Sequence, residues 1–141
     1  MSLRIATLSP ALLLVAACAQ TPADTARQVQ VQQATQDDLQ RKLAGLTPGK
    51  PTSCLPSSLT SARVQTQAFG STLLYVAGRN LIYRNDTTGG CENAGRGDIL
   101  VTQQYNGRAC SGDIATTVDQ YTRSFTGSCA LRDFVPYSRP R

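Results

Sequence analysis

The chain has 141 residues, a formal net charge of +5, and no histidine or tryptophan. The absence of histidine excludes a Ser-His-Asp triad, a Cys-His nucleophile and histidine metal ligands. Its five cysteines contain no C-x-x-C spacing, which argues against a thioredoxin-like redox site and a structural zinc site. The length favours one domain with a tether, and we predict no cofactor, no metal site and no catalytic residue.

Residues 1–17 are predicted to be a lipoprotein signal peptide. Arg4 is the only charged residue before the apolar run IATLSPALLLVAA, which is too short and interrupted for a membrane helix of roughly 20 residues. The run ends in VAAC at Cys18, which resembles the lipobox in which a cysteine thiol receives a diacylglycerol before cleavage. The alternative is an A-x-A-like cleavage site at 17–19, which would leave Gln20 as the first residue.

The cysteine count supports lipidation of Cys18. Five is an odd number, and setting Cys18 aside leaves four cysteines that can form two disulfides. Acyl chains on Cys18 would anchor the domain in the lipid bilayer, because each buried methylene contributes about 0.8 kcal/mol. Ala19, and not an aspartate, follows the cysteine, so we predict the outer membrane, facing the periplasm, in preference to the inner membrane.

Residues 18–53 are predicted to be a flexible tether. They are rich in glutamine, threonine and alanine and contain no aromatic residue, so they have little apolar surface to bury. A short amphipathic helix is predicted within them, from about residue 36 to 44. Thr35 and Asp38 have a spacing similar to that of a capping box, and Gly45 is a stop signal.

Residues 54–141 are predicted to form a disulfide-bonded β domain. Short runs rich in Thr, Val, Ile, Leu and Tyr alternate with glycine and asparagine breaks, which is typical of strands and turns. Hairpin turns are predicted at Gly78–Asn80 and at Asn106–Gly107. The pattern favours a mainly β fold, a small antiparallel barrel or sandwich of about six strands with a short N-terminal helix. The candidate strands are 59–66, 71–77, 80–85, 98–104, 113–119 and 128–135.

Two disulfides are predicted among Cys54, Cys91, Cys110 and Cys129, because small exported domains with a thin core depend on such cross-links. Four cysteines allow three pairings. We prefer Cys91–Cys110, which would clasp the middle of the domain, together with Cys54–Cys129, which would tie its first segment to its last strand. The spacing alone does not decide between the three pairings.

Five sequence segments together resemble a known family. They are LAGLTPGKPTSCLP, GRNLIYRND, GGC, ACSGDIATTVD and GSCALRDFVPY, and they span Leu43 to Tyr137. The family consists of small four-cysteine exported proteins of Gram-negative bacteria and is known only as a domain of unknown function. The resemblance implies a shared fold and export. It implies no activity, because none is assigned to that family.

The acidic residues are candidate catalytic groups, because a glycosidase needs two carboxylates. Asp98 and Asp113 each follow a glycine and open a predicted strand, a position in which a short carboxylate bonds nearby backbone amides. Turn capping is therefore the preferred interpretation. We predict that the chain is not an enzyme, and a carboxylate-based hydrolase is the weakest of the alternatives.

Arginine supplies all the basic charge of residues 54–141, and its planar fork matches phosphates and carboxylates. Arg79 and Arg84 flank the NLIY strand and are the candidate anion-binding residues. The predicted partner is an anionic glycan, lipid or protein of the envelope, and nucleic acid is not expected for an exported chain of modest charge. The predicted function is a non-enzymatic envelope binding or structural module. The alternative is an inhibitor of an envelope-attacking enzyme such as a lysozyme.

Overall fold

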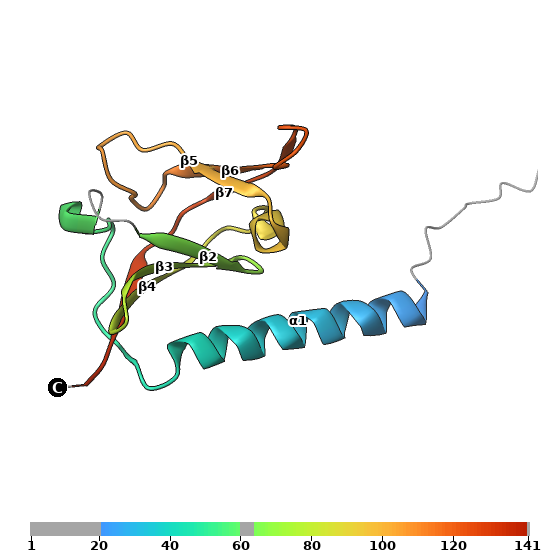
Figure 1. Cartoon of the computed structure of the whole chain (residues 1–141), viewed down its shortest axis with the longest axis horizontal. Coiled ribbons are helices and arrows are strands. Elements are labelled where there is room, and N and C mark those ends of the chain that lie inside the picture. Colours follow the sequence, from blue (N-terminus) through green and yellow to red (C-terminus); the bar gives the residue numbers. More distant parts are fainter. Residues whose placement is uncertain (1–20, 60–63, 141) are drawn as a thin grey trace, which may run out of the picture.

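The computed structural model describes residues 21–59 and 64–140, so the predicted signal peptide and Cys18 lie outside the described residues. The described chain consists of a mainly β body and one long helix that projects beyond it (Figure 1). The elements in chain order are α1 (Pro22–Leu43), β1 (Thr47–Pro48), the short 3-10 helix η1 (Ser57–Leu59), β2 (Gln65–Phe69), β3 (Thr72–Gly78), β4 (Leu81–Asp86), the 3-10 helix η2 (Glu92–Arg96), β5 (Ile99–Thr102), β6 (Ile114–Val118), β7 (Phe125–Ala130) and β8 (Phe134–Ser138).

The strands form two antiparallel sheets. The five-stranded sheet has the order β1-β8-β4-β3-β2, and the three-stranded sheet has the order β5-β6-β7. The predicted mainly β fold with antiparallel pairing is confirmed. The two sheets do not join into a closed barrel, because β2 and β5 each end a sheet without a further strand beside them in the described residues.

The first predicted hairpin is confirmed. β3 and β4 pair directly, with Gly78 opposite Leu81. Gly78 has a φ of 153°, a conformation that favours glycine.

The second predicted hairpin is only half right. β5 and β6 do pair, but the ladder ends at Thr102 opposite Ala115, and residues 103–113 form a loop between them. Asn106–Gly107 lies in that loop, so it does not make a two-residue turn.

The prediction of one strand over 128–135 is wrong. The chain leaves β7 of the three-stranded sheet at Ala130 and enters β8 of the five-stranded sheet at Phe134. Asn85 holds the crossing: its fully buried amide donates to the Arg132 carbonyl, and its carbonyl oxygen accepts from the Arg132 N–H at 3.1 Å. The Asn85 side chain thus bonds the backbone groups of Arg132, which have no strand partner where the chain passes from one sheet to the other.

The predicted tether is largely helical. α1 covers Pro22–Leu43, far more than the expected 36–44. Thr21 is its N-cap and accepts a hydrogen bond from the Asp24 N–H, and Pro22 occupies the first turn. The prediction of a flexible tether is wrong for this segment, because glutamine and alanine favour a helix even where little apolar surface is buried.

The predicted domain boundary at residue 53 is also wrong. β1 pairs with β8, and Thr52 forms an isolated bridge with Phe134. The β body therefore starts near Thr47. The predicted first strand, 59–66, is displaced as well, because β2 starts only at Gln65.

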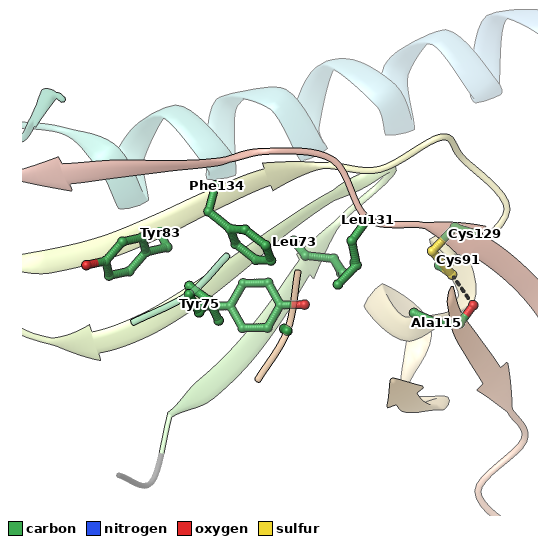
Figure 2. Close-up of a cluster of buried hydrophobic side chains, with 10 residues drawn as sticks. Leu73, Tyr75, Tyr83, Cys91, Ala115, Cys129, Leu131 and Phe134 are labelled. Atoms are coloured by element: carbon green, nitrogen blue, oxygen red, sulfur yellow. Dashed lines mark hydrogen bonds between the residues drawn. A yellow bond between two sulfur atoms is a disulfide. The ribbon is translucent and has the colours of Figure 1, made fainter. Parts of the chain in front are cut away.

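Both faces of the five-stranded sheet are covered. On one face, Leu74 and Ile82 pack with Leu39 of α1 in a small apolar cluster. On the other face, Leu73 and Phe134 belong to the main core under the three-stranded sheet, with Leu131 and the two core tyrosines (Figure 2). This two-sided burial explains why Thr72 to Tyr75 form a continuous buried run and not an alternating one.

The predicted disulfide pairing is wrong, although the two-disulfide framework is confirmed. The bonds are Cys54–Cys110 and Cys91–Cys129. Cys54 and Cys110 face each other in an isolated antiparallel bridge, flanked by the Leu55 N–H to Ala109 carbonyl bond at 2.9 Å. Cys129 lies near the end of β7 opposite Ala115, and the Sγ of Cys91, which directly precedes η2, lies 3.5 Å from the Ala115 carbonyl oxygen.

Candidate functional site

The two candidate anion-binding arginines lie on one hairpin but are not brought together. Arg79 is exposed in the turn between β3 and β4. Arg84 lies further along β4, opposite Leu74 on one side and Val135 on the other. Arg84 lies three residues beyond Leu81, where β4 begins, so about 10 Å of strand separates it from the turn that holds Arg79.

Arg84 already has an anionic partner. Its Nε lies 3.0 Å from the Asp86 Oδ1, which also accepts from the Thr72 hydroxyl at 2.7 Å. Partial burial lowers the pKa of Arg84, but Asp86 and the Tyr137 hydroxyl outweigh it and raise the pKa above its ordinary value. Arg84 is therefore a fixed cation within the face of the sheet that also carries Ile82.

The strand register brings a different arginine to Arg79. Ser138 pairs with Leu81 of β4, so Arg139 continues past the end of β8 beside the turn that holds Arg79. Both side chains are exposed. We call these two residues the basic edge. Sequence reasoning noticed Arg139 only as part of the tail, because the pairing of β4 with β8 joins segments more than 50 residues apart.

The acidic residues serve mainly as turn caps. The Asp113 carboxylate is buried and accepts the Cys110 N–H at 2.8 Å, and Asp98 accepts the Thr126 hydroxyl. Asp119 accepts the Thr122 and Tyr121 N–H groups, and these bonds, that of Thr122 first, lower its pKa below the ordinary value. Asp113 thus has the role expected of a turn cap, whereas Asp98 bonds a side chain of β7 and not a nearby backbone amide.

Asp86 is an acidic residue that sequence reasoning missed. It lies with Asp133, Ser111 and Arg132 around an open hollow of about 420 Å³. Because Asp86 is already bonded to Arg84 and Thr72, it is not a free base. Within residues 21–59 and 64–140, no three acidic or cysteine side chains gather in a way that suits a metal ion.

A larger hollow of about 590 Å³ lies between α1 and the β body. Thr35 and Asp38 line it from the helix, and Phe69 and Arg96 line it from the other side. Its lining mixes apolar, acidic and basic groups. In the described part of the chain no helix is both long enough and apolar enough to cross a membrane.

Comparison with known proteins assigns no family to this chain. No family model matches it, and neither does any curated protein or solved structure. The resemblance to the family of four-cysteine exported proteins therefore stays a prediction, and the function has to be argued from the geometry of the described residues.

Proposed function

We propose that this protein is a lipid-anchored, non-enzymatic module of the bacterial envelope that uses its basic edge to bind an anionic glycan, lipid or protein. The observation that carries the proposal is the position of Arg79 and Arg139 at one end of the five-stranded sheet. Exposed guanidinium groups that are not bound to a carboxylate suit phosphate and carboxylate partners. Arg84, which is paired with Asp86, takes a supporting role.

The anchoring part of the proposal rests on Cys18 and α1. The helix starts at Pro22, shortly after the lipobox-like cysteine, and its 22 residues span roughly 33 Å at 1.5 Å per residue. An acylated Cys18 at one end and a β body docked through Leu39 at the other make α1 a spacer. The β body would then stand away from the membrane surface, facing the periplasm.

The non-enzymatic part of the proposal is supported by the roles of the acidic residues. Asp113 and Asp119 each accept hydrogen bonds from backbone N–H groups of their own turns, and Asp98 accepts the side-chain hydroxyl of Thr126. A general acid or base has to exchange protons with a substrate, and a carboxylate committed to backbone amides is poorly suited to this.

The experiment measures sedimentation of the mature chain with isolated envelope fragments. The Cys18→Ser variant is used, so that acyl chains do not contribute. Binding is compared at about 10 mM and about 1 M salt, between which the Debye length falls from about 30 Å to about 3 Å. We expect binding to weaken strongly with salt.

Arginine variants locate the surface. Replacing Arg79 and Arg139 together with glutamine should reduce binding at low salt by about tenfold or more, which corresponds to about 1.4 kcal/mol. The matched control is Arg123→Gln, since Arg123 is an exposed arginine next to the three-stranded sheet. Two results would rule out the basic edge as the binding surface. One is binding that does not change with salt concentration, and the other is a loss of binding in Arg123→Gln equal to that in the double variant.

A further inference from the structure

The three-stranded sheet has an inner face that is buried and an outer face that is open. Successive side chains of a strand point to opposite faces, so burial separates the two. Ala115 and Thr117 of β6 are fully buried, and Leu100 of β5 packs against the main core. These residues belong to the inner face, which meets the five-stranded sheet. Figure 1 shows the three-stranded sheet on the side of the β body away from α1, so the helix does not cover the outer face.

The outer face is apolar and carries no charged side chain. The strand register places Ile99, Val118 and Phe125 side by side in a row that crosses all three strands. The residues that alternate with the buried ones form this face, and we call it the outer apolar face. It comprises Ile99, Val101, Ile114, Thr116, Val118 and Phe125.

Much of the outer apolar face is accessible to solvent. Phe125 is 67% exposed and Val101 45%, and both Ile99 and Ile114 are more than a third exposed. Tyr121, in the turn that joins β6 to β7, is 84% exposed and lies at the end of the same hairpin. With about 150–200 Å² of surface for each large side chain, the exposed parts amount to about 400–550 Å². A contiguous apolar surface of this size is often an interaction site.

We propose that a second copy of the chain covers the outer apolar face, so that two three-stranded sheets pack face to face about a two-fold axis. Such a contact uses the same surface on both copies. Because this surface is uncharged, no like charges meet in it although the chain carries a net charge of +5. The large side chains of two copies together would bury about 1,000 Å², which is the area that a stable interface needs.

The proposed dimer is independent of the function proposed above, because the basic edge belongs to the five-stranded sheet. Sedimentation velocity of the mature Cys18→Ser chain, between about 5 μM and about 500 μM, tests it by mass action. We expect a dissociation constant of about 10–100 μM, since the interface is at the small end of the stable range. Raising the salt to about 1 M should not weaken the dimer, whereas it should weaken binding to the envelope.

A matched pair of variants locates the contact. Val101→Lys should weaken the dimer at least tenfold, because each copy would bury an unpaired charge against its partner. Val31→Lys introduces the same charge at another exposed valine, on α1, and should change the dissociation constant by less than about twofold. Phe125→Ser removes apolar surface without adding charge and should also weaken the dimer about tenfold. A melting temperature close to that of the unsubstituted chain at about 1 μM, where the protein is monomeric, shows that each variant folds.

Four results would overturn the proposal. One is a monomer over the whole concentration range, and another is equal weakening by Val31→Lys and Val101→Lys. The third is a dimer that survives both Val101→Lys and Phe125→Ser, which would place the contact elsewhere. The fourth is a monomer that binds uncharged phosphatidylcholine vesicles and loses this binding in Val101→Lys, since a membrane would then cover the outer apolar face.

Discussion

Asn85 shows at the residue scale how one side chain decides the path of the chain. It is fully buried in β4 and bonds both the N–H and the carbonyl of Arg132, where the chain changes sheets. We expect Asn85→Ala to lower the free energy of unfolding by about 2–4 kcal/mol, because it leaves two backbone groups unpaired. Urea unfolding measures the change. The exposed Asn106→Ala should change it by less than about 0.5 kcal/mol, and similar values for both variants would contradict this role for Asn85.

Tyr75 gives a prediction about pH. Burial raises the pKa of its hydroxyl to about 12, and the Thr102 side chain only partly opposes this. A folded pKa above the unfolded value of about 10 means that the contribution of Tyr75 to stability is complete below pH 10 and is lost as the pH rises through 12. An absorbance titration of phenolate should show a tyrosine that ionises only near pH 12. Tyr75→Phe should remove that late step, and an unchanged titration curve would show that Tyr75 is not the late group.

Element α1 is the clearest case in which sequence and structure differ. Its buried contact is Leu39, which packs on Leu74 and Ile82, whereas Val29 and Val31 are exposed. The stop signals near Gly45 were predicted correctly because capping and glycine are local effects. The start of the helix at Pro22 was not predicted, since a polar, glutamine-rich segment lacks the periodic apolar residues that mark an amphipathic helix. Thr21 followed by Pro22 is the local signal that would have found it.

The docking of α1 can be tested by one substitution. Leu39→Ala should release the helix from the five-stranded sheet and lower stability by about 2–4 kcal/mol, because it leaves a cavity between Leu74 and Ile82. Hydrogen exchange should then be faster along the C-terminal half of α1. Val29→Ala, on the exposed face, is the control and should leave exchange unchanged. Equal exchange in the two variants would show that α1 does not depend on Leu39.

The strands could be predicted from the sequence where residues close to them in the chain, such as turn residues, mark their ends. The β3–β4 turn at Gly78 was expected from its glycine and asparagine, and it is found there. The crossing near Leu131 was not predictable, because the residue that holds it, Asn85, lies more than 40 positions away. The same reasoning applies to the basic edge, since Arg139 meets the Arg79 turn only through the β4–β8 register.

For the whole molecule, the disulfides fasten segments that the sheets alone do not join. Cys54–Cys110 closes a separation of 56 residues and Cys91–Cys129 one of 38. Loops of this length suggest about 3–4 kcal/mol of stabilisation each. Replacing both cysteines of either pair with alanine should lower the midpoint of urea unfolding by an amount that corresponds to this loss of stability. Peptide mapping without reductant should give only these two linked pairs, and a Cys54–Cys129 peptide would contradict the fold.

The central claim for the whole molecule is that the β body is held at a membrane through Cys18. Mass spectrometry of the mature protein from the membrane fraction tests this most directly. The account predicts an N-terminal peptide that starts at Cys18 and carries three acyl chains, and it predicts that Cys18→Ser moves the protein to the soluble fraction. A mature chain that starts at Gln20 and carries no lipid would contradict the claim.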